Sequence, residues 1–383
     1  MDEDLVNSVF DDPYKSKSLD ELLAILNFSD KQAFIEFYKY DEIEVVHRLS
    51  RTAIGWLSAI FFLIFFVGLT GNGLLIVLVI GKRCMRTVIN IFNVSLALAD
   101  LLVILFCLPF TLLEQATEDW ILGRFMCKTL NYITTVSVVS SVLTITAIAF
   151  ERHSAICHPL RSRVIHTPQR AFLCSVVIWC FTLIFNIPLF FLIDIAYFQH
   201  PFQDITYEFC EWSDVEQEKR VSLYYVLLLY FAPLLLVCAL YASIVQKLWI
   251  RNAVAPADVQ THVDIAANSN IRKKKRATMM LMLVVLLYAL CWLPYHIFIL
   301  FRDFKSSGLE DTERNRFLMA LFQLLGLSNS CNNPVVYGFM NDKFKRNIAA
   351  LLKGKKKTKS LPPPGKRTPA EKLTPMGLIV SSL

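Results

Sequence analysis

The chain has 383 residues, of which 55% are hydrophobic and only 19% charged, and 29 of them are phenylalanine. Such a composition excludes an ordinary soluble domain of this length and indicates a membrane protein. The formal net charge of +7 combines an acidic N-terminus with basic runs that follow apolar segments, which is typical of membrane anchoring rather than of nucleic-acid binding.

Residues 1–50 form an acidic segment that precedes the first apolar run. Two signatures of the Ser-x-x-Glu/Gln type, Ser18–Glu21 and Ser29–Gln32, each precede apolar residues and predict two helix starts. We expect a small helix–turn–helix cap here, with a disordered segment as the alternative. Asn27 begins an Asn-Phe-Ser glycosylation acceptor. The first residues lack the apolar stretch of a signal peptide, so we expect the first apolar run to serve as the insertion signal.

Seven apolar runs follow, each long enough to cross a bilayer, which requires about 20 mostly apolar residues. They lie at about 54–79, 88–113, 127–153, 171–193, 222–248, 277–301 and 316–340. We therefore predict an all-α membrane protein, a seven-transmembrane helix bundle that occupies residues 51–340. A large soluble helical protein is the alternative, which seven runs of this length disfavour.

The charges between the runs predict the orientation of the bundle. Basic residues gather in the links after the first, third, fifth and seventh runs: Lys82, Arg83, Arg86, Arg161, Arg163, Arg170, Arg272–Arg276 and the KGKKK of the tail. The positive-inside rule places these links in the cytoplasm and the acidic N-terminus outside the cell.

The ten cysteines are consistent with this topology. Only Cys127, at the start of the third run, and Cys210, in the link before the fifth, fall on the outer side. The oxidising exterior favours a disulfide between them, with two free thiols as the alternative.

Each predicted span also carries one or two residues that an apolar helix does not need. Asp100 lies in SLALADLL, the third run ends in AFERHSAICHPL, the sixth contains CWLP and the seventh contains SNSCNNPVVY. A proline within a span frees a carbonyl and creates a hinge. Taken together, in order and one per span, these motifs resemble those of the rhodopsin-like (class A) family of G-protein-coupled receptors over about residues 50–350.

This resemblance implies a plasma-membrane, multi-pass receptor and no enzyme, and we find no catalytic triad, phosphate loop or zinc motif in a plausible context. It also implies an amphipathic eighth helix at 341–353, followed by a flexible basic tail at 354–383. The implied partners are a heterotrimeric G protein, arrestin and membrane lipids. The residues that it implies for G-protein activation are Glu151, Arg152, His153, Tyr241, Pro294, Pro334 and Tyr337.

In the family, the carboxylate of the second span belongs to a buried polar cluster that can hold a sodium ion. The matching residues here are Asp100, Ser141, Asn329, Ser330 and Asn333. Oxygen ligands suit a hard cation, and a buried carboxylate needs a counter-charge. The alternative is a protonated, hydrogen-bonded Asp100 with no ion. No other metal or cofactor is expected.

The sequence also narrows the ligand class. Residues 316–340 contain no lysine, which excludes a retinal Schiff base, and Thr134 stands where amine receptors carry an aspartate. The segments KRCMRTVINIF, YASIVQKLWI and GLSNSCNNPVVY look like those of RFamide peptide receptors, above all those for pyroglutamylated RFamide peptide, with neuropeptide FF and neuropeptide Y receptors as cousins. Receptors for other amidated peptides (neuropeptide Y, orexin or RYamide type) are the alternative, and a seven-helix transporter is a distant one.

An Arg-Phe-amide terminus needs carboxylates for its guanidinium, neutral polar partners for its amide and apolar walls for its ring. The positions that the resemblance and this chemistry assign are, in that order, Asp303, Glu211 and Asp214; Thr111, Thr134 and Gln323; and Trp292, Tyr295, His296 and Ile299. The last residues, Ser381–Leu383, match a terminus that PDZ domains bind, which makes a PDZ protein a candidate partner.

Overall fold

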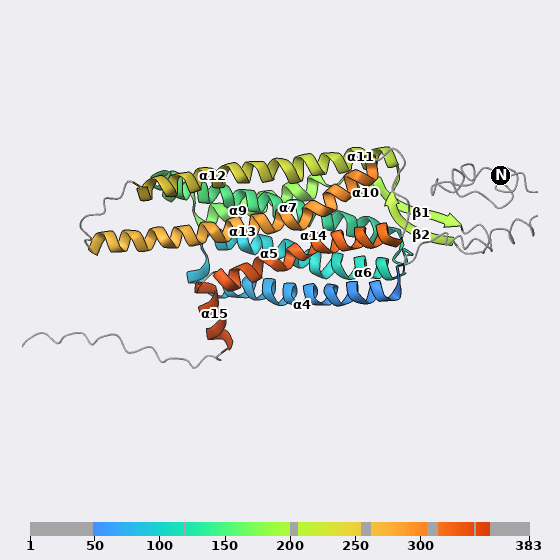
Figure 1. Ribbon diagram of the computed structural model, residues 1–383, viewed down its shortest axis with the longest axis horizontal. Helices are drawn as coiled ribbons and strands as arrows, with labels where there is room; N and C mark the ends of the chain where they lie inside the picture. Colours follow the sequence, from blue (N-terminus) through green and yellow to red (C-terminus); the bar gives the residue numbers. More distant parts are fainter. Residues whose placement is uncertain are drawn as a thin grey trace, which may run out of the picture.

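The computed structural model describes residues 49–117, 119–199, 206–253, 262–304, 313–340 and 342–352. The predictions for the two N-terminal helices, the Asn27 glycosylation site and the C-terminal tail lie outside the described residues. Long helices run side by side along one axis, and a β-hairpin projects from one end of the bundle (Figure 1).

The first three spans are α4 (Arg51–Gly81), then α5 (Val88–Leu102) continued into α6 (Leu108–Thr117), and then α7 (Gly123–Cys157). The next two are α9 (Pro168–Phe185), followed by the short α10 (Leu189–Leu192), and α11 (Val215–Tyr224) continued into α12 (Ala232–Ala253). The last two are α13 (His262–Phe304) and α14 (Glu313–Met340).

The first six spans are long and apolar enough to cross a membrane among the described residues. The seventh helix, α14, is less apolar because it carries the polar run SNSCNN at Ser328–Asn333. It packs against α13 and α4 within the bundle. The predicted seven-helix bundle is confirmed, and α4 and α7 extend a few residues beyond both ends of their apolar runs.

The helix starts follow from local capping chemistry. Ser50 accepts a hydrogen bond from Ala53 N at 3.3 Å and begins α4, and Thr167 accepts one from Arg170 N at 3.3 Å and begins α9. The next residue, Pro168, is tolerated at the first helical position because that backbone N–H has no helical partner. These caps explain why the helices begin before the most apolar residues.

Two spans contain a π-helical segment just before a proline. Val103–Cys107 precedes Pro109, and Tyr225–Phe231 precedes Pro233. A proline has no N–H to donate and its ring crowds the preceding turn, so the helix widens there. In the second case the wider turn accompanies Tyr230, which is buried and donates from its hydroxyl to Ala289 O at 2.7 Å in α13.

Close backbone approach and interhelical hydrogen bonds hold the bundle together. Both are expected in a membrane, because lipid tails are as apolar as the side chains and helix association therefore gains no hydrophobic free energy. Trp179 of α9 donates from Nε1 to Ser95 Oγ of α5 at 3.0 Å, and Ser140 of α7 and Thr182 of α9 share a hydrogen bond of 2.8 Å. Large apolar side chains cover the outer surface instead: Phe62, Phe66, Phe172, Leu173, Ile184 and Leu235 are all exposed. That surface suits contact with lipid.

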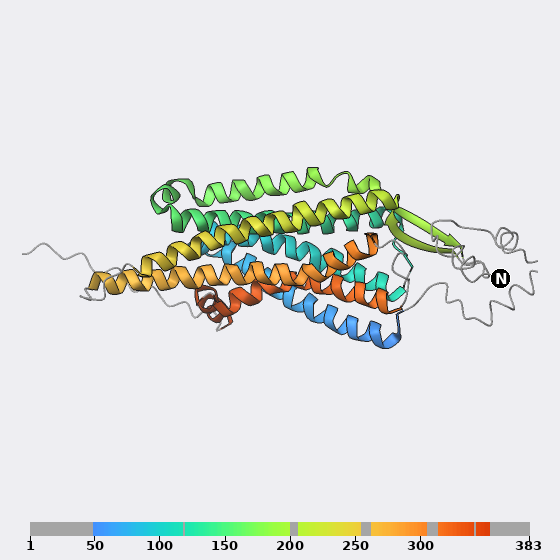
Figure 2. The ribbon, with the colours of Figure 1, turned by 45° about the horizontal axis from the view of Figure 1, so that its top comes forward.

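The two ends of the bundle carry different short elements (Figure 2). At one end β1 (Ile193–Gln199) pairs antiparallel with β2 (Thr206–Trp212). At the other end lies α15 (Asp342–Leu352), in the segment where an amphipathic helix is expected. Phe344 of α15 is buried, and Lys82 at the end of α4 donates from Nζ to Asn347 Oδ1 at 2.7 Å. We call these the hairpin end and the α15 end.

Candidate functional site

The aromatic residues predicted to surround a ligand ring lie together on α13. The ring of His296 stacks on that of Trp292, with 5.9 Å between the ring centroids. Its centroid also lies 4.6 Å from that of Tyr230, in the π-helical segment before α12, and 5.9 Å from that of Tyr295. Ile299, one turn further toward the hairpin end, is buried. We call Trp292, Tyr295, His296 and Tyr230 the aromatic floor. Tyr230 was not predicted, since the sequence does not place its ring against α13.

The predicted acid Asp303 lies beyond this floor, at the hairpin end of α13. It is 7% exposed, and its Oδ1 accepts a hydrogen bond from Nε of Arg302 at 3.0 Å. The same arginine donates from Nη2 to Oε1 of Glu218 in α11. Sequence reasoning missed both Arg302 and Glu218, although an acid in the first turn of a helix after a capping aspartate is a visible signal.

A second pair of acids faces the same region. Glu114 of α6 and Glu211 of β2 interact electrostatically, and Tyr295 lies within the field of Glu114, Glu218, Asp303 and Arg302. Glu211 was predicted, whereas Glu114 was missed. A glutamate in an otherwise apolar span is the signal that could have identified it. Three carboxylates thus act on Tyr295 of the aromatic floor, with Glu211 next to Glu114, and Arg302 pairs with two of the three.

The polar residues predicted to bind an amide are less clearly engaged. Thr111 and Gln323 are half-buried, on α6 and α14. Thr134 directs its hydroxyl to Leu130 O at 2.7 Å and toward Cys107 Sγ at 2.9 Å, so its proton is used within the bundle. Asp214, predicted as a third acid for the guanidinium, caps α11 by accepting from Glu216 N at 2.9 Å and is exposed, which gives it a structural role. Ligand contact by these four residues stays a prediction.

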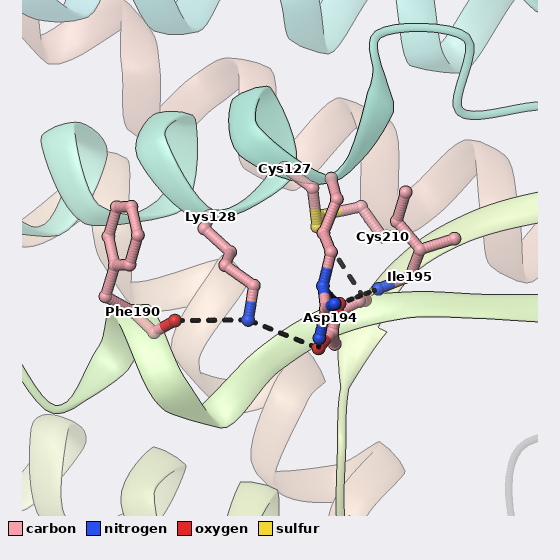
Figure 3. A network of polar contacts seen from close by, with 7 residues as sticks. Cys127, Lys128, Phe190, Asp194, Ile195 and Cys210 are labelled. Atoms are coloured by element: carbon pink, nitrogen blue, oxygen red, sulfur yellow. Dashed lines mark hydrogen bonds and ion pairs between the residues drawn. A yellow bond between two sulfur atoms is a disulfide. The ribbon is translucent and has the colours of Figure 1, made fainter.

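The β-hairpin is fixed to the start of α7 by a disulfide and by charge (Figure 3). Cys127 and Cys210 are bonded, which confirms the predicted disulfide. Asp194 of β1 accepts hydrogen bonds from Arg124 and, at 3.2 Å, from Nζ of Lys128. The Arg124 guanidinium holds the pKa of the Asp194 carboxyl well below its usual range, helped by the Ile195 N–H and by Lys128. We call the side chains of Asp194, Arg124 and Lys128 the hairpin clamp.

A buried polar cluster lies in the middle of the bundle. Asp100 is 2% exposed and accepts a hydrogen bond from Asn333 Nδ2 at 2.9 Å and another from the Ser330 hydroxyl. Asn72 donates to Ser330 O at 2.8 Å. The amide oxygens of Asn72 and Asn333 are buried and find no hydrogen-bond partner among the described residues. Two unpartnered oxygens beside a buried carboxylate are a donor set that fits a hard monovalent cation.

The predicted sodium residues Ser141 and Asn329 are also buried. Among the described residues, no group of three or more His, Cys, Asp or Glu side chains is arranged to hold a metal ion.

At the α15 end, the acid and arginine that close α7 form an ion pair. Glu151 Oε2 and Arg152 Nε lie 3.1 Å apart, and Glu151 is buried. Tyr241 of α12 and Tyr337 of α14 are both buried, and each lies within the field of Arg152. The predicted activation residues therefore come together from three helices.

The remaining predicted activation residues lie nearby or within the helices that would move. The Tyr337 hydroxyl donates to Asn93 Oδ1 at 2.8 Å, and the His153 ring lies 6.0 Å from that of His158. Pro294 and Pro334 lie inside α13 and α14. Each proline interrupts the backbone hydrogen bonding of its helix between the two ends.

The sequence matches the family described as "7 transmembrane receptor (rhodopsin family)" over residues 71–337. It is 35% identical over 341 residues to the QRFP-like peptide receptor of Branchiostoma floridae, an alignment that covers 88% of this chain and 87% of that protein. It is also 35% identical to the pyroglutamylated RF-amide peptide receptor of Rattus norvegicus, covering 76% of this chain and 68% of that protein. Bombesin receptor subtype-3 of Ovis aries is 31% identical, with 82% and 78% covered.

Proposed function

The chain belongs to the rhodopsin family of seven-transmembrane receptors, and from this premise we propose that its ligand is an amidated peptide of the RFamide type. Membership makes it a multi-pass plasma-membrane receptor that couples to heterotrimeric G proteins rather than an enzyme. The names of the relatives with 35% identity include RF-amide peptide receptors, which supports this ligand class.

The observation that carries the proposal is the order of chemistry along α13. Acids lie at the hairpin end, around Asp303, and aromatic rings lie deeper, around His296. Asp303 lies seven positions after His296, which corresponds to about 10 Å along a helix at roughly 1.5 Å per residue. An Arg-Phe-amide terminus carries its cation one residue before its ring, a backbone step of about 3.5 Å. If the two side chains point in opposite directions from this backbone step, the arginine reaches the acids and the phenylalanine reaches the aromatic floor.

We expect the hairpin end to face outward. The acidic side chains of the pocket gather there, whereas the basic link after α4 lies at the α15 end, where Lys82 bonds Asn347 of α15. In this orientation the N-terminus is extracellular and the ligand enters under the hairpin.

Peptide binding then favours a conformer in which Arg152 leaves Glu151 and turns toward Tyr241 and Tyr337, because the ligand has different affinities for the two states. The hinges at Pro294 and Pro334 would absorb the movement of α13 and α14. The opened α15 end would accept the G protein and later arrestin. The amphipathic α15 would lie on membrane lipids, and the C-terminal Ser-Ser-Leu would bind a PDZ domain.

The buried polar cluster is proposed to hold a sodium ion in the resting receptor. Asp100, Ser141, Asn329, Ser330 and Asn333 would supply oxygens to it, and the ion would neutralise the carboxylate. Between them, Asp100 and Asn333 link α5 to α14 by their own hydrogen bond. That bond holds α14 in its resting position, so activation must rearrange it.

Calcium and cyclic-AMP signalling in cells that express this chain tests the ligand class. The panel consists of RFamide and RYamide peptides, each beside its free-acid twin, with surface expression measured by antibody. We expect a response to RFamide peptides that is lost in the free acids and in Asp303→Ala. Surface-expressed receptor that is silent to the whole panel would refute the RFamide proposal and leave the receptor family unaffected.

A further inference from the structure

Arg302 is an internal guanidinium that already occupies the acids proposed to bind the ligand's arginine. Its Nε and Nη2 lie 3.0 and 2.9 Å from Asp303 Oδ1, and its Nη2 also bonds Glu218 Oε1. A guanidinium that bridges two carboxylates makes the same contacts that a peptide arginine would need. Asp303 Oδ1 already takes two contacts from Arg302, so a second guanidinium at this atom would have to replace them.

The exposure of the three side chains shows which one covers the others. Arg302 is 32% exposed, Glu218 16% and Asp303 only 3%. Arg302 is therefore the most accessible of the three side chains and Asp303 the most buried. A peptide guanidinium that reaches this ion pair meets the exposed Arg302 before it meets the carboxylate of Asp303.

One carboxylate oxygen stays unpaired beneath Arg302. Oδ2 of Asp303 is buried, and the part of the chain that the structure describes offers it no hydrogen-bond partner. A buried, unpaired acceptor is costly, and more so when it carries charge. Arg302 thus neutralises Asp303 from one side only, and the second oxygen is available to a cation that can reach it.

We propose that Arg302 is a tethered competitor of the ligand's arginine, and that the peptide gains access to Asp303 when Arg302 turns away. The inference rests on the proposed RFamide function and adds a residue that sets affinity and selectivity for the arginine side chain. Because of this competition, the apparent affinity for the peptide equals the intrinsic affinity multiplied by the fraction of time that the ion pair is open.

Displacement of Arg302 also has a mechanical consequence. The arginine ties the outer end of α13 to Glu218 at the start of α11. When the peptide takes over Asp303, this tie between the fifth and sixth spans is released. Ligand selectivity and the freedom of α13 are therefore coupled through one side chain.

The test measures binding of two peptides that differ only in having arginine or the uncharged isostere citrulline before the terminal Phe-amide. We expect Arg302→Gln to raise the affinity for the arginine peptide about tenfold, which corresponds to an ion pair closed roughly nine-tenths of the time. The citrulline peptide should bind with unchanged affinity. Arg302→Lys, which keeps the charge but loses the planar fork, should fall between wild type and Arg302→Gln.

The control is Arg314→Gln on α14. Arg314 is exposed, and its replacement removes the same charge, so it reports any general change in electrostatic attraction. A lower or unchanged affinity of Arg302→Gln for the arginine peptide would overturn the inference, as would an equal gain for both peptides. Failure of the wild-type receptor to bind either peptide would instead refute the proposed function, and this inference with it.

A second measurement needs no ligand. Thermal unfolding of the purified receptor is compared for wild type, Arg302→Gln, Asp303→Asn and the double variant. We expect the two substitutions to be strongly non-additive, because each removes the same ion pair. Additive effects would show that Arg302 does not hold Asp303 in the ligand-free receptor and would overturn the inference even if Arg302→Gln changes peptide binding.

Discussion

Gly71 of α4 lies against the ring of Pro334 in α14, and replacing it with alanine should separate the two helices. A Cβ built at Gly71 would lie 2.6 Å from Pro334 Cβ and 2.7 Å from Cγ. Because the proline ring is fixed to the backbone, it cannot rotate away as a flexible side chain would. The helices themselves must move by several tenths of an ångström.

Two opposing effects determine the magnitude. Alanine in place of glycine within a helix stabilises by about 0.5–1 kcal/mol, and overpacking a well-packed contact costs about 1–3 kcal/mol. Gly73→Ala is the matched control, because a Cβ at Gly73 would have no atom of another described helix within 4 Å. The two variants share the propensity gain, so their difference isolates the clash, and we expect Gly71→Ala to be less stable than Gly73→Ala by about 1–3 kcal/mol.

The assay is thermal unfolding of the detergent-purified receptor, with all variants heated at the same rate because membrane proteins often unfold irreversibly. Gly71→Ala should unfold several degrees below Gly73→Ala. Equal unfolding temperatures would refute the reasoning that α4 and α14 are held in backbone contact at Pro334.

Three further outcomes are expected. Asp194→Asn should accelerate hydrogen exchange of the β1 amides. Because the pKa of Asp194 is lowered, the stability that the hairpin clamp contributes is complete above the usual aspartate pKa of about 3.9 and is lost only on acidification below it. Protection of the wild-type β1 amides, corrected for intrinsic exchange, should therefore be constant from about pH 5 to 8. Asp100→Asn should abolish the dependence of agonist affinity on sodium concentration, and a dependence equal to that of wild type would count against the ion site. Tyr337→Phe should lower the stability of the ligand-free receptor by about 1–3 kcal/mol, because Asn93 Oδ1 loses a buried donor; unchanged thermal unfolding would contradict this.

The bundle and its disulfide could be predicted because the signals are local and strong. Seven apolar runs of this length are best buried as membrane-spanning helices. Cys127 and Cys210 are the two cysteines that the predicted topology places outside the cell, and they form the disulfide. Glu151 and Arg152, which the family resemblance already groups for G-protein activation, are neighbours in the sequence, and the structure pairs them.

The contacts of the outer pocket could not be predicted in the same way. Neighbouring residues on a helix usually point in different directions, so nothing in the sequence Arg302-Asp303 shows that one side chain folds back over the other. Glu218 joins them from a position 84 residues away. Likewise, the hydrogen bond that the Thr134 hydroxyl donates to Leu130 O depends on the side-chain rotamer rather than on the residue type. Long-range polar contacts of this kind require the packed structure.

Photocrosslinking tests the central claim most directly. An RFamide peptide whose terminal phenylalanine is replaced by a photoreactive analogue is bound to the wild-type receptor, irradiated, and the labelled segment is identified by mass spectrometry. The account predicts labelling in α13 between Trp292 and Ile299, competed by the amidated peptide and not by its free acid. Labelling confined to the β-hairpin strands or to the lipid-facing surface, with none on α13, would contradict it.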